Sequence, residues 1–166
     1  FWILARAAMS CSSADAEQNA AELEQAAAAG SADAQFALGD LYQDGRGGCA
    51  RDLSRAARLF ESAAEQGHVA ALFALGAAHA KGHGTPQDMR KAAFLLRKAA
   101  EAGVVQAQSN YGLALMQGKG VPRDEKAAVD WFVRAADQGD PDVQNWLGLC
   151  YQDGRCGVLI DDAEAA

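Results

Sequence analysis

Proline, aromatic residues and long apolar runs are all scarce in this sequence of 166 residues. The three prolines leave few positions at which a helix is forbidden. Aromatic residues make up 7%, whereas alanine, the strongest helix former, supplies much of the 50% that counts as hydrophobic. No apolar run reaches the roughly 18 residues that span a membrane. The composition therefore predicts an all-α chain, packed through small side chains and without a transmembrane segment.

Positive charge is also in the minority. The formal net charge is −7, and no cluster of lysine and arginine is evident along the sequence. Nucleic-acid binding generally depends on a basic patch that displaces counterions from phosphates. We therefore expect no nucleic-acid partner, and at most a mild preference for basic or neutral protein partners.

Motifs that carry catalysis or metal binding are missing as well. The sequence has no Ser-x-x-Lys, Gly-x-Ser-x-Gly or His-Glu-x-x-His. His79 and His83 have the spacing of two metal ligands on one helix face, but Gly82 between them should end that helix. We expect His79 to pack in the core and His68 to be simply exposed. The sequence thus predicts no enzyme, no cofactor and no metal.

Two series of glycines reveal an internal repeat of 36 to 37 residues. One series lies at the repeat boundaries and the other lies 9 residues further on. The members are Gly30, Gly67, Gly103 and Gly139, then Gly39, Gly76, Gly112 and Gly148. Each unit is predicted to hold a helix A, such as residues 31–44, then a glycine-bearing loop and a helix B. The second glycine should lie where helix A presses on helix B.

Helix boundaries can be assigned from residue chemistry. Glycine just after helix A supplies the left-handed conformation that ends a helix. An aspartate stands where helix B needs an N-cap, and Asp140-Pro141 gives the fourth helix A a cap followed by proline. The four aspartates before helix B are Asp52, Asp88, Asp124 and Asp161.

The repeat phase divides the chain as follows. Residues 15–30 form a lone helix B, followed by repeats at 31–67, 68–103 and 104–139 and an incomplete repeat at 140–166. Residues 1–14 are expected to be a leader or signal-peptide remnant without ordered structure, because Ala14-Asp15-Ala16 resembles a cleavage site. A periplasmic or secreted location is as well supported as a cytoplasmic one. If the chain is exported, Cys150 and Cys156 are near enough in sequence for a disulfide, and that question stays open.

The pattern resembles the Sel1-like repeat, a relative of the tetratricopeptide repeat with a longer, glycine-rich loop. The third copy carries the hallmark from Gly112 through Gly118, Gly120 and Val121 to Asp124. The tyrosine of the hallmark is replaced by His79 in the second copy and by Leu115 in the third. The resemblance implies an α/α superhelical solenoid of antiparallel helix pairs.

The resemblance also implies a protein-interaction scaffold whose helices A line a concave face. Alignment with the tetratricopeptide pattern gives a row of positions that face a partner. They are Phe36, Asp40, Gln43, Phe73, Ala77, Ser109, Leu113, Met116, Asn145 and Leu149. Packing of these side chains against neighbouring helices is the alternative interpretation. The incomplete last repeat supports an alternative function, as a structural segment of a longer envelope or secretion-associated protein. The resemblance also implies a further alternative, a β-lactamase-like hydrolase.

Overall fold

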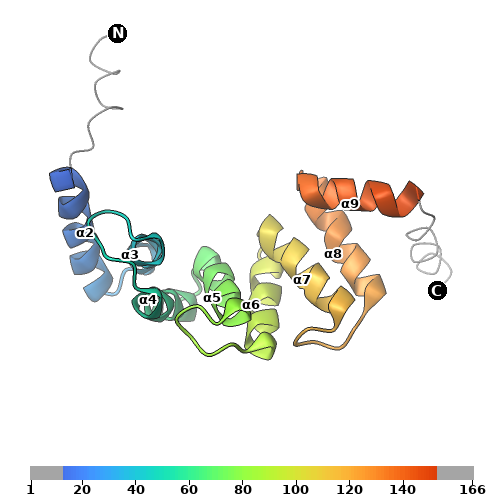
Figure 1. Ribbon diagram of the computed structural model, residues 1–166, viewed down its shortest axis with the longest axis horizontal. Helices are drawn as coiled ribbons and strands as arrows, with labels where there is room; N and C mark the ends of the chain where they lie inside the picture. The colour runs from blue at the N-terminus through green and yellow to red at the C-terminus, as the bar shows by residue number, and fades with distance from the viewer. Residues whose placement is uncertain (1–12, 153–166) are drawn as a thin grey trace, which may run out of the picture.

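The computed structural model describes the backbone of residues 13–152 and the side chains of residues 19–149. Within residues 13–152 the chain forms eight helices and no strand. The helices follow one another along a curved superhelix, and each packs mainly on its neighbours in sequence (Figure 1). The predicted all-α solenoid of antiparallel helix pairs is confirmed. In chain order the helices are α2 (Ser13–Ala28), α3 (Ala32–Asp44), α4 (Leu53–Glu65), α5 (Val69–Lys81), α6 (Met89–Glu101), α7 (Val105–Gln117), α8 (Glu125–Asp137) and α9 (Pro141–Gln152).

The helices A are α3, α5, α7 and α9, and the helices B are α2, α4, α6 and α8. Helix α2 begins at Ser13, two residues inside the segment expected to be a leader, and residues 1–12 lie outside the described residues. Cys156 and Asp161 lie outside them too, as does the side chain of Cys150, so the structure does not describe the postulated disulfide. None of the described helices is both long and apolar enough to cross a membrane.

The predicted caps form at both kinds of helix end. The carboxylate of Asp88 accepts hydrogen bonds from the amides of Arg90 and Lys91 at 3.0 Å each, at the start of α6. Asp52 and Asp124 cap α4 and α8 in the same way. Helices α3, α5 and α7 each end at a glycine with positive φ, namely Gly45, Gly82 and Gly118. Local chemistry therefore fixes where the helix A–loop–helix B unit turns.

In the three complete repeats the glycine inside helix A lies against helix B, as predicted; the helix B that Gly148 would face lies outside the described residues. A Cβ built on Gly39 would be 2.6 Å from Cε1 of Phe60 in α4. A Cβ on Gly112 would be 2.8 Å from Cε1 of Phe132 in α8, and the approach at Gly76 is looser. In the first and third repeats the two helices are therefore held so close that any side chain at this position would have to displace the phenylalanine ring.

A different glycine brings successive repeats together. Gly84, in the loop of the second repeat, has φ 74°, and a Cβ there would be 2.0 Å from the carbonyl oxygen of Leu53. Gly120 stands in the same way against the carbonyl oxygen of Met89. Each loop thus presses on the start of helix B in the preceding repeat. The close backbone contact fixes how one repeat stacks on the next.

Small side chains fill the interfaces between helices. Alanines that are fully buried recur at the same positions of each repeat: Ala63, Ala71, Ala99, Ala107, Ala128 and Ala135. Larger residues gather in two cores, one around Phe60 and Leu38, the other around Leu96, Tyr111 and Phe132. Alanine permits close helix approach, and each large residue of the two cores buries more apolar surface than an alanine does.

Glutamine pairs join consecutive helices B through the helix A between them. Gln66 Nε2 donates to Gln35 Oε1 at 2.8 Å, and Gln35 Nε2 donates to the carbonyl of Ala27 at 3.3 Å. The third repeat repeats this arrangement with Gln138 and Gln108, at 2.7 Å. The second repeat has Leu72 and Ala102 at the corresponding positions. The polar pair is therefore not needed for every repeat to stack.

A polar cluster attaches α2 to the first full repeat. Tyr42 donates to Glu24 Oε1 at 2.8 Å, and Arg55 Nη2 donates to the same oxygen at 3.1 Å. The guanidinium of Arg55 also lies 4.3 Å from the centroid of the Tyr42 ring. Burial, and then the hydrogen bond to Glu24, raise the pKa of Tyr42 to about 12. The neutral phenol therefore holds α2, α3 and α4 together.

Candidate partner-binding groove

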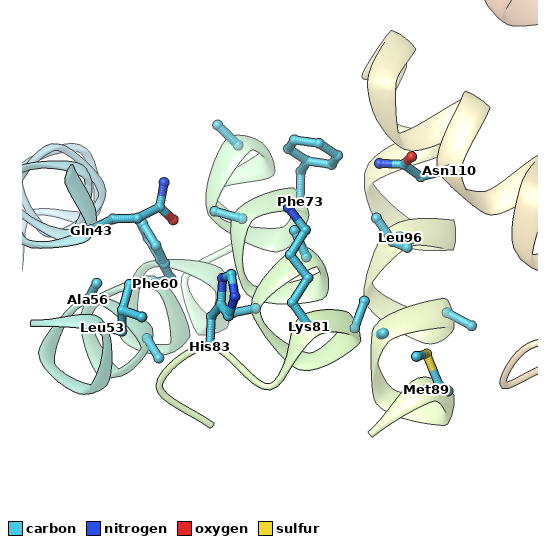
Figure 2. Close-up of a pocket in the computed structure, with 18 of the residues that line it drawn as sticks. Gln43, Leu53, Ala56, Phe60, Phe73, Lys81, His83, Met89, Leu96 and Asn110 are labelled. Atoms are coloured by element: carbon cyan, nitrogen blue, oxygen red, sulfur yellow. The ribbon is translucent and has the colours of Figure 1, made fainter. Parts of the chain in front are cut away.

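A groove of about 760 Å³ crosses the middle of the superhelix. The helices α3, α5 and α7 contribute most of its lining, and buried residues of α4 and α6, such as Phe60 and Leu96, close its base. Its volume is within the range of roughly 300–1,000 Å³ found for ligand pockets. Figure 2 shows Gln43, Leu53, Ala56 and Phe60 on one side, Met89, Leu96 and Asn110 on the other, and Phe73, Lys81 and His83 between them.

Residues of the predicted row from three helices meet in this groove. Those that line it are Phe36, Asp40 and Gln43 of α3, Phe73 and Ala77 of α5, and Leu113 of α7. Leu113 is 47% exposed, although it is a large apolar residue. Phe36 and Phe73 are partly buried and also contact the two cores. The three apolar side chains therefore offer part of their surface to the groove.

The other members of the row lie elsewhere. Ser109 donates to Asp140 Oδ2 at 2.5 Å, a contact that joins α7 to the start of α9. Met116 packs against the second core. Asn145 and Leu149 of α9 are exposed and do not line the groove. On α7 the lining consists instead of Asn110, Leu113, Ala114 and Gln117.

Charges of both signs line the groove. Asp40 and Asp44 come from α3 and Arg51 from the loop before α4, whereas Lys81 comes from α5 and Lys119 from the loop after α7. Burial, and then the neighbouring Asp44 carboxylate, raise the pKa of Asp40, although Arg46 opposes the shift. The Asp40 carboxylate is thus incompletely compensated, and a cation placed beside it would favour its charged form.

His68 has a definite structural role, contrary to the expectation that it is simply exposed. Its side chain is only 19% exposed and stacks on Phe36, with the ring centroids 4.8 Å apart. Nδ1 accepts a hydrogen bond from the amide of Ala71 and so caps α5, while Nε2 lies 3.3 Å from Asp33 Oδ1. Sequence reasoning missed this because histidine is an unusual N-cap. The imidazole supports the Phe36 wall of the groove.

The other two histidines are separated as predicted by the end of α5. His79 is buried, and its Nδ1 lies 3.1 Å from Thr85 Oγ1, so it packs within its own repeat. His83 is exposed and lines the groove beyond Gly82. No group of three or more metal-ligating side chains gathers within the described part of the chain.

The expectation that lysine and arginine do not cluster is wrong for α6. Four exposed cations, Arg90, Lys91, Arg97 and Lys98, lie on this one helix around the exposed Phe94. Arg90 and Lys91 are adjacent, and Arg97 and Lys98 follow seven residues later, about two helical turns along the same face. A helical reading of residues 89–101 would have revealed the cluster, whereas a search for consecutive basic residues does not.

Comparison with known proteins places these features in a family. Residues 32–68, 69–104, 105–140 and 141–166 each match the Sel1 repeat. The structure resembles a protective antigen of uropathogenic Escherichia coli with an SLR fold, with a TM-score of 0.76 and 39% identity, over 81% of this chain and 29% of the antigen. A Sel1 repeat protein from Oxalobacter formigenes gives a TM-score of 0.75 and 35% identity, over 81% of this chain and 55% of that protein.

A more distant structural neighbour is cysteine-rich protein B of Helicobacter pylori. It has a TM-score of 0.54 and 26% identity, over 57% of this chain and 71% of its own. None of the curated proteins compared with the chain matches it. The chain spans less than two thirds of the length of the Escherichia coli and Oxalobacter formigenes proteins.

Proposed function

Because the chain belongs to the Sel1 repeat family, we propose that it is a scaffold that binds a segment of a partner protein in the groove across α3, α5 and α7. Sel1 repeats are generally non-enzymatic and typically mediate protein interactions. The observation that carries the proposal is the apolar line formed by Phe36, Phe73 and Leu113 along one groove. These residues come from three successive repeats, so an elongated segment would contact all of them.

The charges of the groove define the chemistry of this segment. An apolar side chain would occupy the space between Phe73 and Leu113, where water would otherwise cover apolar surface. A basic residue of the partner near α3 would face Asp40. Its positive charge would stabilise the Asp40 carboxylate, whose pKa is raised by burial and by the neighbouring Asp44. Acidic residues would face Lys81 in the middle of the groove and Lys119 in the loop after α7. The partner is therefore an amphipathic segment with its basic end over α3.

The proposal is tested by selecting binding peptides from a random library on the purified chain. The selected sequences should share an apolar residue with a basic residue on one side of it. Leu113→Asp should weaken their binding roughly tenfold or more, because a buried leucine contributes about 1.5–3 kcal/mol. Asp40→Asn should reduce the preference for the basic residue.

Leu149→Asp is the matched control. Leu149 occupies the position of Leu113 in the next repeat, is 55% exposed and lies outside the groove lining. This variant should bind the selected peptides as the parent chain does, with both variants keeping the parent's helical circular dichroism. Equal losses in the two variants, or none in Leu113→Asp, would show that the groove is not the binding site.

A further inference from the structure

We propose that α6 carries a second docking surface, on the side away from the groove, which binds an acidic segment of a partner protein. The surface consists of Arg90, Lys91, Phe94, Arg97 and Lys98, and is called the α6 basic face below. At about 100° per residue, these five positions share one side of the helix. The groove-lining residues Met89, Ala92, Ala93 and Leu96 lie on the opposite side.

Phe94 is the centre of the α6 basic face. It is 49% exposed, whereas the phenylalanines at the two core centres, Phe60 and Phe132, are buried. Lys98 Nζ lies 4.7 Å from the centroid of the Phe94 ring, and Arg97 Cζ lies 5.8 Å from it. Both distances are within the range of a cation–π contact. An apolar ring bordered by cations offers both a hydrophobic contact and charge to a partner.

The other helices B do not carry such a surface. Helices α4, α6 and α8 have the same length and the same register, so their positions can be compared directly. The position of Phe94 is held by Arg58 in α4 and by Asp130 in α8. The positions of Arg90, Lys91, Arg97 and Lys98 are held in α4 by Ser54, Arg55, Glu61 and Ser62, and in α8 by Lys126, Ala127, Val133 and Arg134. The repeat fold therefore does not require the α6 basic face.

Most of these charges are available to a partner. Arg97 has a salt bridge with Glu101 at 3.6 Å, in the same helix. Arg90, Lys91 and Lys98 make no side-chain salt bridge with any other described residue. The four cations stand in a chain whose net charge is −7. A local basic patch on an acidic protein attracts an anionic ligand. The ligand must be short, because a longer one would also meet the negative charges on the rest of the surface.

The small size of the α6 basic face favours a short acidic peptide segment over a nucleic acid. A nucleic acid extends its phosphates well beyond two turns of helix, over surfaces that carry the excess negative charge. An acidic segment with an apolar residue can contact Phe94 and place its carboxylates on the flanking cations. Because the α6 basic face is opposite the groove lining, the two surfaces could hold different segments together.

The test measures binding of a fluorescein-labelled peptide in which leucines at helical spacing are flanked by glutamates. Fluorescence anisotropy should show saturable binding that weakens as salt is added, because exposed charge pairs are screened. A peptide with glutamine in place of glutamate should bind roughly tenfold more weakly. Arg90→Glu with Lys98→Glu should produce a loss of at least that size, and Phe94→Ala should weaken binding without changing the salt dependence.

Lys126→Glu with Arg134→Glu is the matched control. It makes the same charge change at the same two helix positions of α8 and should leave peptide binding within about twofold of the parent. An equal loss in this control, or tighter binding of a DNA duplex than of the peptide, would overturn the proposal. So would a change of oligomeric state in Arg90→Glu with Lys98→Glu, since it would mark the face as a contact between copies. Leu113→Asp should not affect this peptide, so the outcome is independent of the proposed groove function.

Discussion

Gly39→Ala should destabilise the protein even though alanine is the better helix residue. Exchanging glycine for alanine inside a helix gains about 1 kcal/mol. At Gly39, however, the new Cβ would be 2.6 Å from Cε1 and 2.8 Å from Cδ1 of Phe60. The Phe60 ring is 1% exposed and lies 5.8 Å from the ring of Phe36, so it has little room to move.

The two opposing terms give the expected magnitude. Overpacking a well-filled core costs about 1–3 kcal/mol. After the helix gain of about 1 kcal/mol is subtracted, Gly39→Ala should lower the free energy of unfolding by up to about 2 kcal/mol. For a chain of this size, each kcal/mol lowers Tm by roughly 2–4 °C. Urea titration and thermal melting followed by circular dichroism measure both quantities.

A second substitution separates the clash from other causes. Phe60→Leu removes the ring atoms that the new Cβ would meet, at its own cost in packing. In that background Gly39→Ala should become neutral or stabilising, because only the helix gain remains. Gly76→Ala should be milder in the parent chain, since its Cβ would lie 3.2 Å from Leu96 Cγ. The same loss from Gly39→Ala with and without the Phe60 ring would refute the reasoning.

Three further predictions concern charge and polar packing. Asp40→Asn should raise Tm at neutral pH and have little effect at pH below 3.8, because the raised pKa of Asp40 means that ionisation opposes folding as the pH rises. Asp88 has a lowered pKa owing to its hydrogen bonds with the amides of Lys91 and Arg90, so its stabilising contribution should be lost as the pH falls below 3.8. Asp88→Asn should make Tm depend less on pH in that range, as a pH series of thermal melts would show. Gln108→Leu alone should destabilise by about 1 kcal/mol, because it removes the hydrogen bonds of the buried Gln108 with Gln138 and with the carbonyl of Ala100. Adding Gln138→Ala should recover much of that loss in urea titration, since the second repeat packs well with leucine and alanine at these positions.

The groove illustrates where prediction from sequence reaches its limit. Counting fixed positions from the glycine of helix A predicts lining residues of α3 and α5, but on α7 only Leu113 of the three predicted residues lines the groove. There Ser109 and Met116 turn toward α9 and the second core. Whether an equivalent position lines the groove therefore depends on the tertiary contacts of its own repeat, such as the contact of Ser109 with Asp140.

Sequence alone determined the features that depend on nearby residues. Capping aspartates, left-handed glycines and the interval of about 36 residues fix the helices, their ends and the repeat phase, because these interactions close within a few residues of the chain. Only the tertiary structure decided which side chains meet. The stacking of His68 on Phe36, the convergence of three helices on one groove and the exposure of Phe94 among four cations depend on how neighbouring repeats are oriented. That orientation arises from close contacts such as Gly84 against Leu53, whose geometry no single repeat contains.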